Sequence, residues 1–313
     1  MKKEKKVLCI YHKVDLDGVV SAATVVRRYG AENVTLVGWN YGDAVPITDM
    51  EEAVKNGHLI ILVDVSFSVD VMQRFSAKTI KIDDQEFPLN FVWIDHHSSA
   101  LQESERSAYA RIKGLRTCKR AACELTYEFL FGNGKPTPPG ITLLGQYDSW
   151  RQDETWEQVL NFQYGMRQYG LDPLEMPEFL FETHVQRTIN ATMEEGKAIR
   201  KYLRHKNQAE CKLYSFEAEI CGLKAICLNT LEFQSHTFAS VYDEKKHDLM
   251  CSFVLNGWDC TMSLRSTKAE INCGEIAQVF GGGGHKGSAS FKPIWAAFEN
   301  FLITKRLGSA LKP

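Results

Sequence analysis

Residues 59–65 read LIILVDV, five apolar residues followed by an aspartate and a valine. The short length and β-branched content of this run predict a strand that is buried on both faces, as in a parallel sheet. Three further runs share this character, and they are VLCIY (7–11), VTLVGW (34–39) and NFVWID (90–95). Helix-compatible segments at 20–29, 49–56 and 69–77 separate the four runs. The alternation predicts an α/β fold with a doubly wound, mainly parallel sheet and right-handed crossovers.

The second half of the chain has a different pattern. Residues 186–209 are polar and helix-forming, with few bulky apolar positions, which predicts a linker helix. Short strand-like pieces follow from residue 210, together with a helix over 273–280 and the loop GGGGHKGSAS at 281–290. We therefore expect a first domain over 1–185, the linker over 186–209 and a smaller α/β domain over 210–313.

Composition narrows the class of protein. The formal net charge is −2, which argues against tight binding of long DNA or RNA, because such binding draws its affinity largely from neutralised phosphates. No apolar run approaches the ~20 residues of a membrane span, and the apolar stretch after MKKEKK is too short for a signal-peptide core. Nine cysteines occur without a C-x-x-C pair, which disfavours a disulfide framework or a thiolate zinc site. We expect a cytoplasmic protein with no membrane partner.

Acidic and imidazole residues follow the predicted strands, at the edge where open parallel sheets bind ligands. They are His12, Asp15 and Asp17 after the first strand, Asp64 in the third run, Asp95, His96 and His97 in and after the fourth, and Asp148 after the apolar run at 141–147. Taken singly, these residues have ordinary explanations as turns, surface histidines or helix caps. As a set they predict a functional site, because several independent capping accidents would have to coincide at one edge.

The types of these residues indicate a metal centre. The candidate ligands are His12, Asp15, Asp17, Asp64, His96 and Asp148. Four carboxylates and two imidazoles without thiolate favour hard divalent ions such as Mn²⁺ or Mg²⁺. Six groups exceed the need of one ion but suit two, with one carboxylate as a bridge. A pair of metals about 3.5–4 Å apart is the usual apparatus for hydrolysing a phosphate ester. We therefore expect two divalent ions, Mn²⁺ first and Mg²⁺ as the alternative.

Four stretches, in this order and spacing, resemble the motifs of the DHH phosphoesterase family: HKVDLDGVVSAA (12–23), LVDVSFS (62–68), VWIDHHSSA (92–100) and GQYDSW (145–150). GGGGHKGSAS resembles the glycine-rich motif of the substrate-binding domain that completes many of these enzymes. The QYDSW and GGGGH segments point to oligoribonucleases of the nano-RNase type. In some members three residues separate the first histidine from the aspartate, whereas two separate His12 from Asp15 here.

The resemblance implies a role for each candidate residue. It places the first metal on His12 and Asp15 and the second on Asp17, His96 and Asp148, with Asp64 bridging both. It implies that His97 faces the scissile phosphate, where it stabilises developing charge or protonates the leaving oxygen. Asp95 is then expected to orient a ligand imidazole through its other ring nitrogen.

The glycine-rich segment is a candidate for substrate binding. Residues without Cβ let backbone N–H groups approach an anion closely, and neighbouring cationic side chains add donors. The candidates are Arg265, Gly282, Gly283, Gly284, His285 and Lys286. A flexible linker is the alternative explanation of four glycines, but the helix before them and the strand-like SASF after them disfavour it. Two weaker candidates are the basic cluster Arg116, Lys119 and Arg120, which is otherwise a solvated face, and the segment Asn40-Tyr41-Gly42.

These expectations combine into a metal-dependent phosphodiesterase that cleaves dinucleotides and short RNA to mononucleotides. One alternative keeps the chemistry and changes the substrate, as a phosphatase on 3′-phosphoadenosine 5′-phosphate, a pyrophosphatase or an exopolyphosphatase. Another is a catalytically silent nucleotide-binding regulatory protein. The expected partner is a short oligoribonucleotide or a small phosphorylated nucleotide, and a homodimer stays open.

Overall fold

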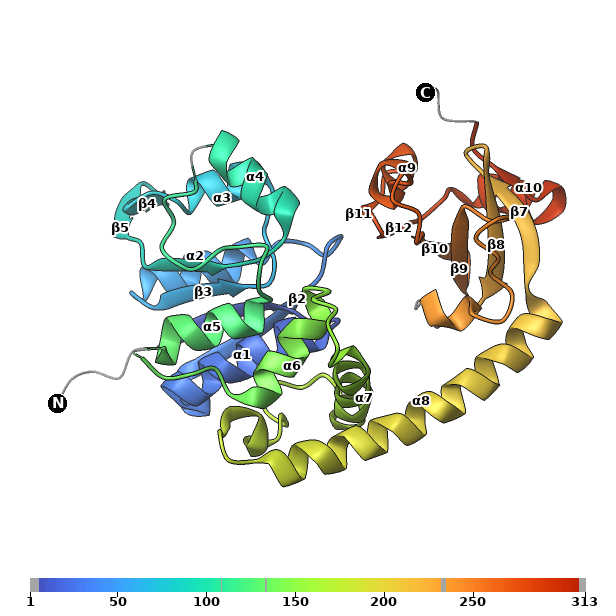
Figure 1. Ribbon diagram of the computed structural model, residues 1–313. Coiled ribbons are helices and arrows are strands. Elements are labelled where there is room, and N and C mark those ends of the chain that lie inside the picture. The colour runs from blue at the N-terminus through green and yellow to red at the C-terminus, as the bar shows by residue number, and fades with distance from the viewer. Residues whose placement is uncertain (1–5, 108, 133, 232–234, 310–313) are drawn as a thin grey trace. The chain divides into compact units, whose positions relative to one another are not determined.

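The computed structural model describes residues 6–107, 109–132, 134–231 and 235–309. The chain divides into two compact units whose boundary lies between Ile199 and Arg200. That boundary falls inside one long helix, α8 (Gln186–Tyr214), which covers the segment expected to be a linker (Figure 1). Within the described ranges, no helix is both long and apolar enough to cross a membrane.

The first unit is built on a parallel sheet of four strands in the order β2-β1-β3-β6. The strands are β1 (Val7–His12), β2 (Val34–Trp39), β3 (Leu59–Val63) and β6 (Phe91–Ile94). They coincide with the four apolar runs, so the predicted parallel α/β sheet is confirmed. A separate antiparallel hairpin, β4 (Thr79–Ile82) with β5 (Gln85–Pro88), was not predicted, because its strands are four residues long and half exposed.

Helices cover both faces of this sheet, as expected for a doubly wound fold. They are α1 (Leu16–Tyr29), α2 (Ile47–Lys55), α3 (Val69–Arg74), α4 (Ser98–Arg106), α5 (Ala122–Phe131), α6 (Pro139–Asp148) and α7 (Trp156–Met166). Side chains of β1 alternate between two cores. Cys9 packs with α1 and α5, and Ile10 packs on the other face with α2.

The second unit holds a seven-stranded mixed sheet in the order β11-β12-β10-β9-β8-β7-β13. The strands are β7 (Phe216–Ile220), β8 (Leu223–Asn229), β9 (Leu249–Asn256), β10 (Asp259–Arg265), β11 (Gly283–His285), β12 (Ser288–Phe291) and β13 (Arg306–Leu307). Helices α9 (Cys273–Val279) and α10 (Trp295–Thr304) pack on it through an apolar core. The smaller α/β domain is confirmed, but part of the expected glycine loop is strand β11.

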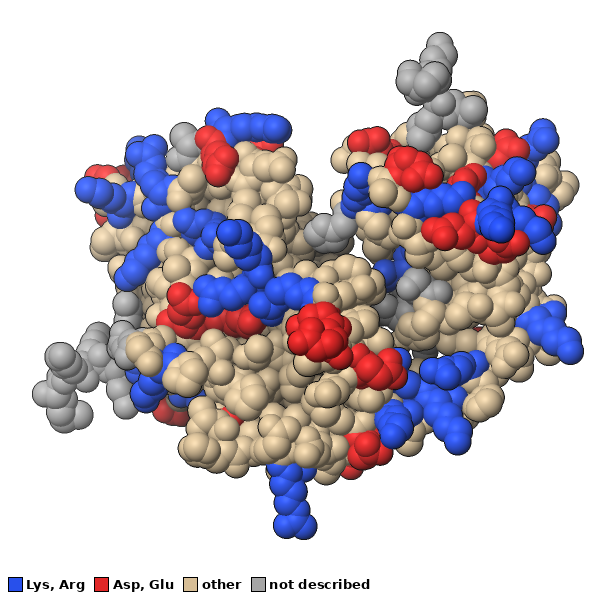
Figure 2. Space-filling model, viewed as in Figure 1, with Lys and Arg blue, Asp and Glu red and all other residues tan. Residues whose placement is uncertain are grey.

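Charges on the surface are mixed. Figure 2 shows both basic and acidic side chains on the visible face of each unit. Arg74 and Glu51 form one of the ion pairs of the first unit. All nine cysteines are free thiols, and eight of them are buried.

Candidate metal centre

Three strands of the first unit end at the same level of the sheet. Tyr11 pairs with Val63, and Val63 pairs with Ile94, in the parallel register. The next residue on each strand is therefore a neighbour of the others, and these residues are His12, Asp64 and Asp95. The continuous apolar runs thus do two things. They bury the strands, and they bring three polar side chains together at the carboxyl edge.

Asp64 lies at the middle of this group and is only 2% exposed. Its Oδ2 is 3.4 Å from His12 Nδ1, and its Oδ1 is 3.3 Å from His96 Nε2. The backbone of Asp64 has φ 60°, in the left-handed region that aspartate and asparagine tolerate better than most residues. A hydrogen bond from its N–H to the carbonyl of Ile94 (2.9 Å) holds this conformation. Asp64 therefore offers one oxygen to each of two histidines, which is the arrangement that a bridging carboxylate requires.

The first cluster of ligand atoms comes from His12, Asp15 and Asp64. Asp15 Oδ2 lies 2.7 Å from His12 Nδ1, while Asp15 Oδ1 accepts the N–H of Gly18 (2.9 Å) and caps α1. A Cβ at Gly18 would lie 2.1 Å from the carbonyl oxygen of His12, so only glycine lets α1 begin this close to β1. Gly18 thus permits the close start of α1, and Asp17 beside it is a candidate metal ligand.

The second cluster comes from Asp17, His96 and Asp148. His96 Nε2 lies 3.1 Å from Asp148 Oδ2 and 3.5 Å from Asp17 Oδ2. Asp17 also accepts the N–H groups of Ala122 (2.8 Å) and Cys123 (2.7 Å), so it caps the start of α5. Asp148 is the last residue of α6, so the expectation that it follows a strand at the sheet edge is wrong. The structure nevertheless brings all six candidate ligands together.

The charges of the six candidate ligands favour the binding of a cation. Burial alone would lower the pKa of His12 and His96, but their carboxylate partners outweigh it and raise the two pKa values to about 11 and about 12. Burial, together with Asp64 and Asp148, raises the pKa of Asp17 well above its ordinary range. Without metal, the carboxylates are thus balanced by protons on the imidazoles. A carboxylate and imidazole set of this kind fits Mn²⁺ or Mg²⁺, which would take the place of those protons.

This exchange gives a testable pH dependence. The two histidine pKa values lie above neutral pH, so binding of Mn²⁺ at pH 7 must displace one proton from His12 and one from His96. We expect the apparent affinity for Mn²⁺ to rise with pH between 6 and 8. Isothermal titration in buffers of different ionisation enthalpy measures the released protons, and binding without proton release would contradict this assignment.

His97 is held by Asp95. Asp95 is fully buried, and its Oδ1 lies 2.7 Å from His97 Nδ1 and accepts the backbone N–H groups of His96 and His97. Asp95 therefore orients His97, and the expectation that it orients a ligand imidazole is wrong. The reason is local: the carboxylate turns back over the two residues that follow it. Burial would lower the pKa of His97, but Asp95 and Asp64 raise it overall.

A third grouping of ligand atoms, Asp64, His96 and His97, would make His97 a metal ligand. Its Nδ1 is 3.9 Å from Asp64 Oδ1 and is already paired with Asp95 at 2.7 Å. A donor bonded to one carboxylate in this way is poorly placed to bind an ion through the same nitrogen. The cluster of His12, Asp15 and Asp64 and the cluster of Asp17, His96 and Asp148 therefore fit an ion better than this third grouping.

The candidate substrate-binding residues lie in the second unit. Arg265 ends β10 opposite Ser288 of β12, and the carbonyl of Lys286 accepts the N–H of Cys273 (2.8 Å). His285 belongs to β11, but its side chain lies outside the described part of the structure.

The glycines of this segment have different roles. A Cβ at Gly282 would lie 2.3 Å from the carbonyl oxygen of Ser290, and one at Gly284 would lie 2.5 Å from Ala289 Cα. Packing against β12 thus explains both. Gly283 has no atom within 4 Å of a Cβ and no positive φ, so the fold does not require glycine there.

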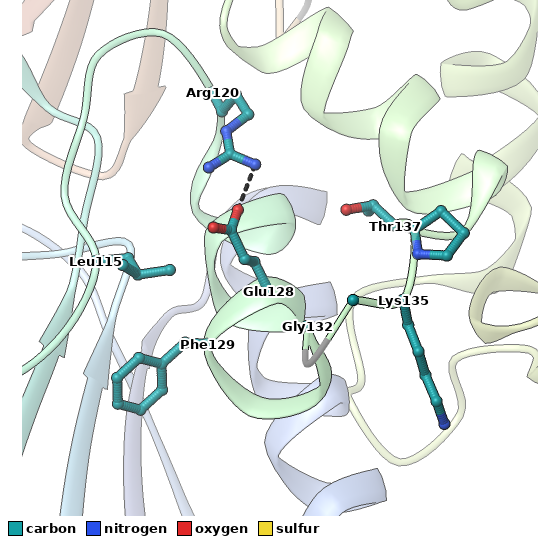
Figure 3. A pocket seen from close by; sticks show the side chains of 9 residues that line it. Leu115, Arg120, Glu128, Phe129, Gly132, Lys135 and Thr137 are labelled. Carbon is teal, nitrogen blue, oxygen red and sulfur yellow. Dashed lines mark ion pairs between the residues drawn. The ribbon is translucent and has the colours of Figure 1, made fainter.

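Two residues of the basic cluster after β6, Arg116 and Arg120, make contacts within the first unit. The guanidinium of Arg116 donates to the carbonyls of Trp93, Ala110 and Ile112 and lies 4.8 Å from the centroid of the Trp93 ring. Arg120 pairs with Glu128 at 2.5 Å in a pocket of about 600 Å³ around α5 and the segment after it (Figure 3). None of the six candidate ligands lines this pocket.

Part of the first unit matches a known protein family. Residues 6–144 match the DHH family, N-terminal domain. The DHH match contains five of the six candidate ligands, and Asp148 follows four residues after its end. No curated protein matches the chain in sequence.

Solved structures resemble the whole chain. A DHH domain of a member of the s1p family of ribosomal proteins has a TM-score of 0.62 at 13% identity, over 96% of this chain and 85% of that one, which supports the fold. The exonuclease RecJ bound to manganese has a TM-score of 0.47 at 14% identity, over 97% and 89%. The pGpG-specific phosphodiesterase PggH from Vibrio cholerae has a TM-score of 0.44 at 12% identity, over 96% and 97%.

Proposed function

We propose that this protein is a metal-dependent phosphodiesterase that hydrolyses dinucleotides and other short RNA fragments, with two Mn²⁺ ions at the cluster around Asp64. The observation that carries the proposal is the position of Asp64, whose two oxygens face His12 and His96 separately. A single ion would use one of these clusters, whereas a bridged pair uses both. The match of residues 6–144 to the DHH family supports phosphoester chemistry.

Each side chain then has a task in the reaction. Two bound metal ions would supply a water of lowered pKa and would neutralise charge on the phosphoryl oxygens. His12, Asp15, Asp17, Asp64, His96 and Asp148 would hold them. His97, held by Asp95, would present its Nε2 to the leaving oxygen and protonate it as the P–O bond breaks. Asp95 and Asp64 raise the pKa of His97 overall, which favours the protonated form that an acid requires.

Two features favour a short nucleic-acid substrate. The net charge of −2 argues against tight binding of long strands, because such binding draws its affinity largely from neutralised phosphates. Arg265 on β10 and Gly283 on β11 come from the two strands that flank β12, and Lys286 follows β11; these residues would bind the phosphates or terminal groups of a small ligand. The same residues suit a nucleotide bisphosphate, so 3′-phosphoadenosine 5′-phosphate is the second candidate.

A substrate panel decides between these candidates. Purified protein with Mn²⁺ is incubated with labelled di- to pentaribonucleotides, a long RNA, 3′-phosphoadenosine 5′-phosphate and pyrophosphate. We expect the short oligonucleotides to be hydrolysed fastest and the long RNA to be spared. Preferential turnover of the bisphosphate or of pyrophosphate would move the assignment to that substrate, and the absence of all turnover would refute the proposal.

Gly283 gives a direct test of substrate binding by the second unit. The fold has room for a methyl group at this position, whereas a ligand on the backbone would meet it. We expect Gly283→Ala to raise KM about tenfold or more without changing the melting temperature. Gly282→Ala is the matched control for packing, because its Cβ would strike the carbonyl of Ser290, and it should lower the melting temperature. An unchanged KM for Gly283→Ala would remove this residue from the substrate site.

A further inference from the structure

The segment after β2 lies against the candidate metal centre. His12 pairs with Trp39 in the parallel register, so Asn40 comes directly after the partner of His12. Asn40 Oδ1 is 3.2 Å from His12 Nε2. The other ring nitrogen, Nδ1, faces Asp15 at 2.7 Å and Asp64 at 3.4 Å. The imidazole is thus held between an amide on one side and two carboxylates on the other.

The conformation of Asn40 is fixed within its own segment. Its N–H donates to Asp43 Oδ2 (2.9 Å), and its carbonyl accepts the N–H of Asp43 (2.9 Å). Lys13 Nζ donates to the same carboxylate oxygen at 2.7 Å, which ties the segment to the residue after His12. The backbone that carries the Asn40 side chain is therefore held by contacts within the protein.

The orientation of the Asn40 amide follows from a second contact. Tyr41 N–H donates to Asn40 Oδ1 at 2.9 Å. A backbone N–H can only donate, so the atom that receives it must be the amide oxygen rather than the amide nitrogen. The same oxygen faces His12 Nε2. Because an amide oxygen can only accept, Nε2 must carry a hydrogen.

We propose that Asn40 is a positioning residue that selects the Nε2–H form of His12 and thereby presents the Nδ1 lone pair to the first metal ion. A neutral imidazole has one protonated nitrogen, so a hydrogen on Nε2 leaves Nδ1 free to bind an ion between Asp15 and Asp64. His96 differs, since it turns Nε2 toward its carboxylates. The two histidines thus present opposite nitrogens, and His12 requires its own control of the tautomer. This inference rests on the proposed metal centre but not on the substrate.

Two substitutions distinguish the effect of the acceptor oxygen of Asn40 from the effect of the size of its side chain. Asn40→Leu keeps the size and removes the acceptor, whereas Asn40→Asp keeps an acceptor oxygen. We expect Asn40→Leu to weaken Mn²⁺ binding at the first site by about 10- to 100-fold, with the second site unchanged. The Asn40→Asp variant should bind Mn²⁺ at the first site at least as tightly as the unaltered protein does. Isothermal titration, with two resolved binding events, measures both sites.

A control variant tests whether loss of order in the segment after β2, rather than loss of the acceptor oxygen, weakens Mn²⁺ binding. Asp43→Ala removes the contacts with Asn40 N–H and Lys13 but leaves the acceptor, so it should weaken binding less than Asn40→Leu.

A second measurement uses the unaltered protein and needs no variant. With Mg²⁺ bound, long-range ¹H–¹⁵N correlation spectra of histidine-labelled protein should show His12 with its hydrogen on Nε2.

Three results would overturn the inference. They are a hydrogen on Nδ1 of His12 in the Mg²⁺-bound protein, unchanged first-site affinity in Asn40→Leu, or equal losses in Asn40→Leu and Asn40→Asp. Failure of the substrate proposal looks different. In that case the unaltered protein would leave short RNA intact while the effects of Asn40 on Mn²⁺ binding persisted.

Discussion

Asp64→Asn is expected to reduce hydrolysis by at least about 10³-fold, because loss of a bridging carboxylate removes several kcal/mol of stabilisation from the transition state. Asparagine has almost the same size and tolerates the left-handed backbone that Asp64 adopts, so the fold should persist. What changes is the charge and the second metal-binding oxygen. Activity on short RNA, Mn²⁺ stoichiometry and circular dichroism together measure the effect.

A matched control is available in the β4–β5 turn. Asp84 has φ 62°, close to the 60° of Asp64, but its side chain is 95% exposed and pairs with Lys81 at the surface. Asp84→Asn should leave hydrolysis and metal content unchanged, since exposed ion pairs contribute little. Near-normal turnover in Asp64→Asn would show that Asp64 is not the bridge.

His97→Gln is expected to lower kcat by about 10²- to 10⁴-fold, the usual range for loss of a general acid, with little change in KM. Glutamine fills part of the space of the imidazole but cannot transfer the proton. Mn²⁺ affinity should remain normal, because His97 Nδ1 is engaged by Asp95 and is 3.9 Å from Asp64. A large loss of Mn²⁺ affinity would instead make His97 a ligand.

The pH profile gives an independent check on the same residue. Asp95 raises the pKa of His97, so the acid form persists above the ordinary histidine range and kcat falls only as pH rises through the raised pKa. Asp95→Asn removes the charge and should lower the pKa of His97. The descending limb of the profile should therefore move to lower pH. A profile that Asp95→Asn leaves unmoved would exclude His97 as the acid.

Much of the site followed from the sequence because strand ends are easy to locate. Continuous apolar runs fixed where β1, β3 and β6 end, and parallel pairing then brings His12, Asp64 and Asp95 to one level. Asp148 was harder. A short apolar run does not distinguish a helix from a strand, and α6 delivers Asp148 from a helix terminus instead.

Other details depend on side-chain direction, which sequence spacing does not determine. Arg116 looked available for a ligand but donates to three backbone carbonyls. The carboxylate of Asp95 folds back over the backbone N–H groups of His96 and His97, and the imidazole that it contacts is that of His97. Asn40 was only a weak candidate from the sequence, because the role proposed for it depends on the contact of its side chain with His12 on the neighbouring strand. These residues share a feature, since each acts through a hydrogen bond rather than through burial.

The central claim is that Asp64 joins two metal ions, and electron paramagnetic resonance of the Mn²⁺-loaded protein tests it most directly. Two Mn²⁺ ions that share a carboxylate are expected about 3.5–4 Å apart, close enough for their spins to couple. The account predicts two bound equivalents with an exchange-coupled spectrum that becomes an isolated Mn²⁺ spectrum in Asp64→Asn. One bound equivalent, or two equivalents with uncoupled spectra in the unaltered protein, would contradict it.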